Sequence, residues 1–280
     1  MRCAEIQLRI ASMQELRRIV TALRSLASMR MQQAVRTIPG VRQYGAAIAT
    51  AIEDMLPLVP ERPAPLAATR GGRRALILCT SEQGFVGDFN EQLFEAAAPQ
   101  RERGELLFVL GTRGAALAEG RGWKLSWSGR TATRIASLTE AVERLAGALY
   151  RAIARNEVTS AQVLFPRYRH GTGPKIERHP LFPLDLARKG RAPARAPPLH
   201  NLPPAALLEK LLAEYVFALL SEAAIETLAS ENEARFNAMG AAQDNLARKL
   251  EQLEQQGREA RQEEVTTELL DLVTGAEAAR

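Results

Sequence analysis

The sequence predicts an α/β protein in which a Rossmann-like α/β domain is inserted between long N- and C-terminal helices that form an antiparallel coiled coil. Three observations predict this fold class. After Pro204 the chain runs for about seventy residues without another proline and carries an apolar seam. The first 56 residues carry a shorter amphipathic pattern. Between these two segments, short apolar runs alternate with amphipathic stretches, as in βαβ units.

Composition argues against membrane-spanning, secreted, disulfide-rich and zinc-binding classes of protein. The chain has 280 residues, of which 46% are hydrophobic and 25% charged, as is usual for a globular protein. It has no run of eighteen apolar residues and no apolar signal core at its start, so we expect neither a membrane span nor secretion. Two distant cysteines and three histidines without paired spacing argue against a disulfide framework and a zinc site.

The first segment, residues 1–57, is expected to be one arm of the coiled coil. Its apolar residues are separated by three or four positions or by sums of these steps, and arginines fill the positions between them. The pattern predicts that Pro39 and Gly40 kink or break the helix. It ends at Pro57, after which several prolines indicate a linker. The apolar positions are Met13, Leu16, Val20, Leu23, Ala27, Ala34 and Ile38.

The middle segment, residues 73–198, is expected to form the α/β domain. Short apolar runs predict buried strands, and apolar residues that recur on one face predict helices. This alternation predicts a parallel or mostly parallel sheet flanked by helices. The expected strands are 75–80, 105–110, 123–127 and 161–169, the expected helices are 89–103, 113–119 and 137–155, and 178–186 is an expected edge element.

The third segment, residues 204–280, is expected to be the second arm of the coiled coil. Positions separated alternately by three and four residues form a heptad seam, and six of the eight are apolar. The earlier stretch, 207–228, is more apolar all round and is expected to pack on the α/β domain as well. The seam positions are Phe236, Met239, Gln243, Leu246, Leu250, Leu253, Gly257 and Ala260.

Charge favours pairing of the two arms. The first 56 residues hold eight arginines against four acidic residues, whereas residues 205–280 hold fifteen acidic against seven basic residues. Because the C-terminal arm is longer, its last stretch is expected to have no partner within this chain. Exposed apolar surface there would cost about 25 cal/mol per Å², which predicts a partner protein that encloses the tip.

The segment from Ser81 to Gly87 follows a strand and precedes a helix, where α/β proteins often bind phosphate. It has no Gly-Lys-Ser/Thr, and its glycine spacing fits neither nucleotide fingerprint, so we interpret it as a turn and expect no cofactor. Two alternatives remain open at this point. An α/β nucleotide-dependent enzyme with a coiled-coil arm would need a catalytic constellation, and a tether that binds nucleic acid would need a concentrated basic stripe.

The C-terminal tract VTTELLDLVTGAEA resembles the signature of the gamma subunit of F-type ATP synthases. Two further regions resemble that family: SEQGFVGDFN, residues 81–90, and the helix from Arg9 to Arg30. The signature positions are Val265, Thr266, Glu268, Asp271, Gly275, Ala276 and Ala278, and upstream matches are Ala238-Met239, Asp244-Asn245 and Ala260-Arg261-Gln262.

The resemblance implies a central-stalk rotor that couples ion flow through a membrane ring to ATP synthesis or hydrolysis in a catalytic ring. The chain would be no enzyme by itself, and it would bind neither nucleotide nor nucleic acid. Its implied partners are the ATPase alpha and beta subunits, an epsilon subunit and the membrane c-ring, with one copy in each heteromultimeric complex. It would lie peripherally on the cytoplasmic face of the bacterial inner membrane.

The resemblance also implies roles for three groups of residues. A gripping section would hydrogen-bond a loop of the catalytic ring, and a smooth apolar tip would act as a bearing. A third group would contact the membrane ring or the epsilon side. The gripping residues are Arg261, Gln262, Thr266 and Glu268, the tip residues are Leu269, Leu270, Leu272 and Val273, and the third group is Ser81, Glu82, Phe89, Asn90 and Leu184.

Several positions depart from the family pattern. Leu23 and Ser25 stand where the family has methionines, and Gly87-Asp88 replaces a Gly-Gly pair. The disulfide-bearing regulatory insert of the chloroplast type has no counterpart in the sequence. These departures suggest a divergent branch, for which the alternate, sodium-translocating bacterial ATPases are one candidate. The sequence leaves open whether H⁺ or Na⁺ is moved.

Overall fold

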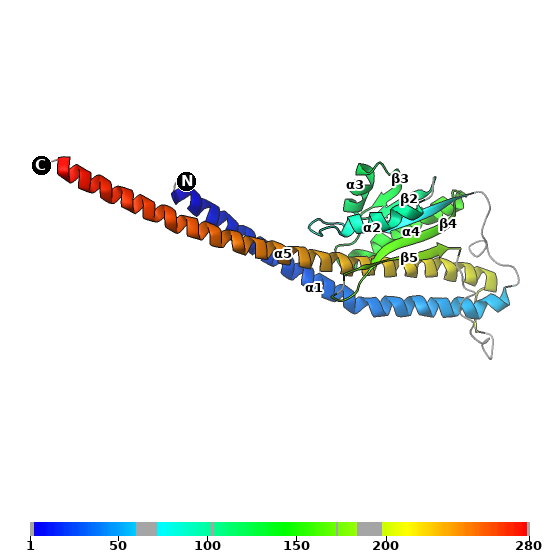
Figure 1. Cartoon of the computed structure of the whole chain (residues 1–280). Coiled ribbons are helices and arrows are strands. Elements are labelled where there is room, and N and C mark those ends of the chain that lie inside the picture. The colour runs from blue at the N-terminus through cyan, green and yellow to red at the C-terminus, as the bar shows by residue number, and fades with distance from the viewer. Residues whose placement is uncertain (1–2, 60–71, 102–103, 172, 184–197, 279–280) are drawn as a thin grey trace. The chain divides into compact units, whose positions relative to one another are not determined.

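The architecture of the chain is given by a computed structural model that describes residues 3–59, 72–101, 104–171, 173–183 and 198–278. The predicted fold class is confirmed: long N- and C-terminal helices flank an α/β domain (Figure 1). The helices are α1 (Cys3–Met55), α2 (Phe89–Ala97), α3 (Thr112–Gly120), α4 (Leu138–Ala154) and α5 (Pro204–Ala278). The strands are β1 (Arg73–Cys79), β2 (Leu106–Leu110), β3 (Leu125–Gly129), β4 (Val158–Arg167) and β5 (Lys175–Phe182). Short 3₁₀ turns cover Leu56–Leu58, Ala98–Gln100 and Ile135–Ser137.

The chain divides into two compact units. One comprises Ser28–Arg235 and the other comprises Met1–Ala27 with Phe236–Arg280. The long helices α1 and α5 therefore contribute to both units, and the unit boundaries fall inside them. The sequence-based division at residues 57, 73, 198 and 204 stays a prediction.

The sheet of the α/β unit has the strand order β3-β2-β1-β4-β5. β1 pairs in parallel with β2 and β4, and β2 pairs in parallel with β3. The expected edge element is the strand β5, which begins earlier than predicted, at Lys175, and pairs antiparallel with β4. A mostly parallel sheet was therefore predicted correctly.

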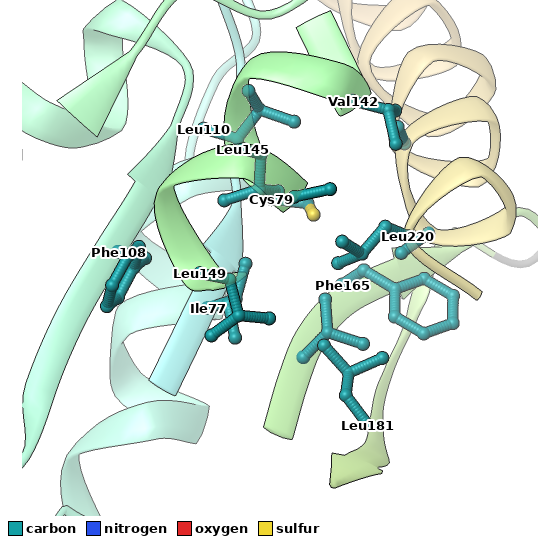
Figure 2. Packing of buried hydrophobic residues seen from close by; sticks show 14 of the residues in the cluster. Ile77, Cys79, Phe108, Leu110, Val142, Leu145, Leu149, Phe165, Leu181 and Leu220 are labelled. Atoms are coloured by element: carbon teal, nitrogen blue, oxygen red, sulfur yellow. The ribbon is translucent and has the colours of Figure 1, made fainter. Parts of the chain in front are cut away.

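The central strand β1 is buried on both faces because helices cover both sides of the sheet. Its residues point alternately into two hydrophobic cores, one on each face of the sheet. Ala75, Ile77 and Cys79 belong to the first core, whereas Leu76 and Leu78 belong to the second. The first cluster includes apolar residues of α1, α4 and α5, and the second includes those of α2 and α3. Figure 2 shows part of the first cluster, in which Leu145 and Leu149 of α4 lie over β1 and Leu220 of α5 lies beside Phe165.

The helix α1 continues through Pro39, so the helix is not broken there, whereas a kink, the other predicted outcome, stays a prediction. A proline inside a helix costs about 3 kcal/mol because it removes one hydrogen bond and crowds the preceding turn. Here the neighbouring residues Ala34 and Ile38 are buried in the main core. Their burial offsets this cost, and tertiary packing therefore overrides the local preference.

A partly buried ionic network ties α1 and α5 to the sheet within the α/β unit. The Glu226 side chain has no exposed surface; it pairs with Arg42 of α1 and accepts a 2.9 Å hydrogen bond from the backbone N–H of Tyr168. Arg167 at the end of β4 binds Glu177 at 2.6 Å and Glu222 at 3.2 Å, and its Nη1 lies 3.8 Å from Glu226. Three carboxylates thus share two guanidinium groups that come from different elements.

The coiled-coil unit confirms the predicted seam of α5. Met239, Leu250, Leu253 and Gly257 are buried, and the other seam positions are half-buried. On α1, Ile6 and Ile10 complete this core, whereas Leu16, which was predicted on the stripe, is 44% exposed. The 3–4 spacing that continues from Ile6 and Ile10 through Met13 to Val20 does not include Leu16, which explains its exposure.

Contacts within this unit show that the two helices run antiparallel. A Cβ placed on Gly257 would lie 3.4 Å from Ile6 Cγ2, while nearer the middle of α5 Arg24 donates a 2.6 Å hydrogen bond to Gln243. Gln243 also donates to Thr21 at 2.7 Å. The polar seam position is therefore satisfied, and a satisfied polar residue at such a position fixes the register of a coiled coil.

Candidate functional site

The last described turns of α5 expose the residues predicted to grip a partner. Arg261, Gln262, Thr266 and Glu268 are all exposed, in a stretch where every residue from Arg261 to Leu270 is exposed. The Thr266 hydroxyl donates a 2.7 Å hydrogen bond to the Gln262 carbonyl, as threonines on helices often do. Gln262 and Thr266 line a shallow hollow on one side of the helix, together with Glu259, Glu263 and Thr267.

The same turns expose apolar side chains. Val265 is 49% exposed, Leu269 57%, Leu270 61% and Leu272 70%, whereas the helix is buried at Leu250 and Leu253. Val265, Leu269 and Leu272 are spaced by four and three residues, so they share one face of the helix. The backbone of Val273 is helical, but its side chain lies outside the described part of the chain. An apolar stripe of this kind on an exposed helix is typical of surfaces that contact another protein.

The second predicted region is the loop between β1 and α2. Ser81 and Asn90 bind each other twice: the Ser81 N–H donates to Asn90 Oδ1 at 3.0 Å, and Asn90 Nδ2 donates to Ser81 Oγ at 2.8 Å. Ser81, Glu82 and Phe89 are buried, so they shape the loop from within. Phe85, which was not predicted, is 70% exposed. The predicted contact residue Leu184 lies outside the described residues.

Glu82 takes the place where a phosphate would bind in many α/β proteins. Its Oε2 accepts hydrogen bonds from the backbone N–H groups of Thr112, at the start of α3, and Thr131, at 3.1 and 3.0 Å. Its Oε1 accepts a 3.0 Å bond from Arg130. Nearby, a Cβ on Gly114 would lie 2.2 Å from the Thr80 hydroxyl, so α3 packs closely on the strand end. An anion site at the α3 N-terminus is thus filled by the chain's own carboxylate.

The surroundings of Glu82 lower its pKa. Burial alone would raise the pKa, but hydrogen bonds from Thr112, Arg130 and Thr131 to the ionised carboxylate outweigh burial. A carboxyl group whose pKa is lower in the folded chain stabilises the fold at pH values above its ordinary pKa. This contribution is lost as the pH falls through the lowered folded pKa.

We expect Glu82→Gln to lower the free energy of unfolding at pH 7 by about 1–3 kcal/mol, because three donors lose an ionised acceptor. The difference from the parent chain should shrink as the pH falls below the ordinary glutamate pKa of 4.5. Urea unfolding at several pH values measures both effects. Glu119→Gln, at an exposed position of the adjacent helix α3, is the control and should show little change at any pH. A Glu82→Gln deficit that is constant between pH 7 and pH 3.5 would contradict the assignment.

Two buried charged residues of α5 were missed in the sequence. Glu231 and Arg235 contact the 81–84 stretch, and burial raises the pKa of Glu231 against the opposing influence of Arg235. The sequence did contain a sign of these residues. The stretch SENEAR, residues 230–235, places three charged residues in a part of the helix that packs on the core and that apolar residues flank on both sides. Neither residue could be assigned a partner without the structure, because the contacts span about 150 positions.

Within the part of the chain that the structure describes, no group of three or more His, Cys, Asp or Glu side chains is arranged to hold a metal ion. None of the helices that the structure describes is both long and apolar enough to cross a membrane.

Comparison with known proteins gives matches along the whole chain. A family model described as ATP synthase matches residues 2–279. The ATP synthase gamma chain of Geobacter sp. (strain M21) is 24% identical over 98% of each chain. The gamma chain of Parafrankia sp. (strain EAN1pec) is 28% identical and covers 98% of this chain and 96% of its own.

Two solved structures share the fold. In the Euglena gracilis mitochondrial ATP synthase (OSCP/F1/c-ring, rotational state 3), one chain matches with a TM-score of 0.69 and 15% identity, over 99% of this chain and 94% of that chain. The rotor of the same synthase in rotational state 1 contains a chain that matches with a TM-score of 0.66 and 14% identity, over 94% of this chain and 98% of that chain. Both likenesses extend over the long helices and the α/β domain together.

Proposed function

Because the chain belongs to the ATP synthase family, whose model matches residues 2–279, we propose that it is the central-stalk rotor (gamma) subunit of an F-type ATP synthase or ATPase. Its relatives are named ATP synthase gamma chains, in agreement with the resemblance seen in its C-terminal tract. The divergent, sodium-translocating subtype stays a prediction. In this role the chain couples ion flow through a membrane ring to ATP synthesis or hydrolysis in a catalytic ring.

The exposed end of α5 is the observation that carries the proposal. In the coiled-coil unit the seam ends at Ala260, and the following turns expose Val265, Leu269 and Leu272. Fully burying one such side chain contributes about 1.5–3 kcal/mol. A partner that encloses this end would therefore gain substantial free energy, and the catalytic ring of an ATPase is the partner we propose.

The proposed mechanism is mechanical. Arg261, Gln262, Thr266 and Glu268 grip a loop of the catalytic ring through directional hydrogen bonds, for which the planar guanidinium of arginine is well suited. The apolar tip beyond them makes contacts that lack directional bonds, so it slides as a bearing. As the chain turns, its contacts with each catalytic site of the ring change. These changes favour different conformational states of that site in succession.

By itself the chain is proposed to be no enzyme. Its proposed partners are the alpha, beta and epsilon subunits and the c-ring. One copy serves each complex, peripherally on the cytoplasmic face of the bacterial inner membrane. Support for a non-catalytic role comes from Glu82, which occupies the donors that a phosphate would need. The loop from Ser81 to Asn90 is proposed as a second contact region, on the membrane-ring or epsilon side, and Phe85 is an exposed apolar side chain of this loop.

Affinity purification tests the proposal. A tagged copy of the chain, expressed in its host and extracted from membranes with mild detergent, should bring down the ATPase alpha and beta subunits and the c-ring. An untagged strain is the control. Recovery of the chain without alpha or beta subunits, or micromolar ATP binding by the isolated chain, would contradict the proposed function.

A further inference from the structure

A polar layer crosses the apolar seam of the coiled-coil unit. The seam positions of α1 follow Ile6 and Ile10 at steps of three and four residues, and this spacing reaches Arg24. On α5 a polar residue of the seam is Gln243. Both residues are half-buried, so a guanidinium and an amide lie where most of the seam is apolar, and each needs a partner across the interface.

The two polar residues bind each other. Arg24 Nη1 donates a 2.6 Å hydrogen bond to Gln243 Oε1, and Gln243 Nε2 donates a 2.7 Å hydrogen bond to the Thr21 hydroxyl. The Thr21 hydroxyl in turn donates to the Arg17 carbonyl at 2.8 Å. Residues of α1 therefore use both ends of the amide, the oxygen as an acceptor and the nitrogen as a donor.

The surface of α5 beside Gln243 has room for the Arg24 guanidinium. Phe236, Gly240 and Gln243 are separated by four and three residues, so they share one face of the helix. The central carbon of the guanidinium lies 4.6 Å from the centre of the Phe236 ring, as in a cation–π contact. A Cβ on Gly240 would lie 3.5 Å from the same guanidinium. A side chain longer than alanine at this position would therefore displace Arg24.

A second specific contact lies two heptads further along α5. Gly257 is buried on the seam, and a Cβ placed there would lie 3.4 Å from Ile6 Cγ2. Ile6 is only 2% exposed, so its side chain fills the space beside the glycine. Glycine is unfavourable inside a helix, but at this position the missing side chain is what admits Ile6.

The polar layer would be lost if α5 slipped by one heptad, which is the nearest shift that keeps the seam facing α1. Such a slip would bring Phe236 or Leu250 to the place of Gln243. Neither side chain can accept a hydrogen bond from Arg24, so the guanidinium would lose its partner on α5.

The same slip would also destroy the glycine contact. It would bring Leu250 or Glu264 to the place of Gly257. Either side chain would need the space that Ile6 fills, and the glutamate would in addition bring a charge into an apolar layer. The two contacts therefore select the same register by different means, one by hydrogen bonding and the other by shape.

We infer that these two contacts lock the register of the coiled coil, and that Arg24 and Gln243 are positioning residues which set how far the end of α5 stands beyond α1. In the coiled-coil unit α5 continues past the start of α1, and the exposed Leu269 and Leu272 lie in that part (Figure 1). A slip of one heptad would move them by about 10 Å, at about 1.5 Å per residue. For the contact of this end with a catalytic ring, the inference rests on the proposed function; the register lock does not.

The distance between two spin labels measures the register in the full-length chain. The labels are attached to cysteines introduced by Gln14→Cys on α1 and Glu263→Cys on α5, both at exposed positions. Cys3→Ser removes a competing thiol, and Cys79 is buried and stays unlabelled. The parent chain should show a single narrow distance distribution.

Three paired variants test the polar layer. Arg24→Leu with Gln243→Leu should add a second population, displaced along the axis by about 10 Å. The exchanged pair, Arg24→Gln with Gln243→Arg, keeps a donor facing an acceptor and should restore the single distance. Arg36→Leu with Gln252→Leu makes the same changes at exposed positions and is the matched control, which should behave as the parent does.

Thermal unfolding separates a lost register from lost stability. The thermal midpoint of the leucine pair should equal or exceed that of the parent chain, because a polar residue on the seam specifies the register at a cost in stability. A residue that served stability alone would lower the midpoint when replaced and would leave the label distance single.

ATP synthesis by energised vesicles tests the positioning of the α5 end. In assembled complexes the leucine pair should lower synthesis by about threefold or more, because displaced ends miss their contacts. The exchanged pair should restore synthesis together with the single label distance, and the control pair should leave both unchanged.

Four results would overturn the inference. The leucine pair could keep a single distance, or the exchanged pair could fail to restore it. The second population could come with a lower thermal midpoint, which would indicate lost packing and not a slip. Synthesis could stay unchanged although the register is split. Failure of the parent chain to co-purify with the catalytic head would instead contradict the proposed function and leave the register lock standing.

Discussion

Replacing Glu226 with alanine will lower the free energy of unfolding by about 1–3 kcal/mol, because it removes a fully buried acceptor from the Tyr168 N–H and from the ionic network. The Glu226 carboxylate pairs with Arg42, lies 3.8 Å from Arg167 Nη1 and accepts the Tyr168 N–H. Removal leaves that N–H without its acceptor and leaves the two guanidinium groups with less compensating charge. Urea or thermal unfolding of the purified chain measures the loss.

Glu140→Ala is the matched control for this prediction. It removes the same side chain from a helix, but Glu140 is 73% exposed and pairs with Arg144 four residues away. Exposed ion pairs of this kind contribute about 0.3–0.5 kcal/mol, so this variant should unfold almost as the parent does. If Glu226→Ala were no more destabilising than Glu140→Ala, the network would not tie α1 and α5 to the sheet.

Deletion of residues 269–280 will reduce ATP synthesis by about tenfold or more, because it weakens the contact with the catalytic ring, about tenfold in affinity for each 1.4 kcal/mol of contact free energy lost. The deletion removes Leu269 and Leu272, which are more than half exposed and contribute little to the chain's own core. Folding should therefore be spared. Synthesis by energised vesicles and unfolding of the isolated chain are the two measurements.

Two further variants make the truncation interpretable. Leu269→Gln with Leu272→Gln should reproduce much of the coupling loss without shortening the helix. Gln255→Ala, at an exposed position of α5 beside the seam, should leave coupling unchanged. Collapse of the α/β unit in the truncated chain would contradict the assignment of these residues to a partner contact, as would full synthesis activity.

Local patterns predicted most of the fold correctly. Runs such as Ala75 to Cys79 can be buried only in a sheet covered on both faces, and the 3–4 spacing along α5 identified the seam before its partner was known. The predictions that failed depended on distant residues. Pro39 stays helical because its neighbours pack on the core, and Leu16 is exposed because the seam follows Ile6 and Ile10.

Less of the candidate site than of the fold could be predicted from the sequence. Sequence order placed Ser81, Glu82 and Phe89 in one loop, but only the structure shows that they are buried and that Phe85 is exposed. The anchor of this loop, Arg235, lies about 150 positions away along the chain. Contacts over that separation depend on how α5 packs on the sheet, and no local pattern encodes them.

Rotation can be observed directly with a label on the α/β unit. A cysteine introduced at Ser126, on the exposed side of β3, can carry the label once Cys3 is replaced by serine. Cys79 will not compete, because burial raises the pKa of its thiol to about 12 and leaves it unreactive.

The measurement that tests the rotor assignment most directly is single-molecule tracking of this label in complexes whose catalytic ring is fixed to a surface. On addition of ATP, the label should turn in one direction, in discrete steps, at a rate set by hydrolysis. A label that stays still while the same complexes hydrolyse ATP would contradict the assignment of this chain as the rotor.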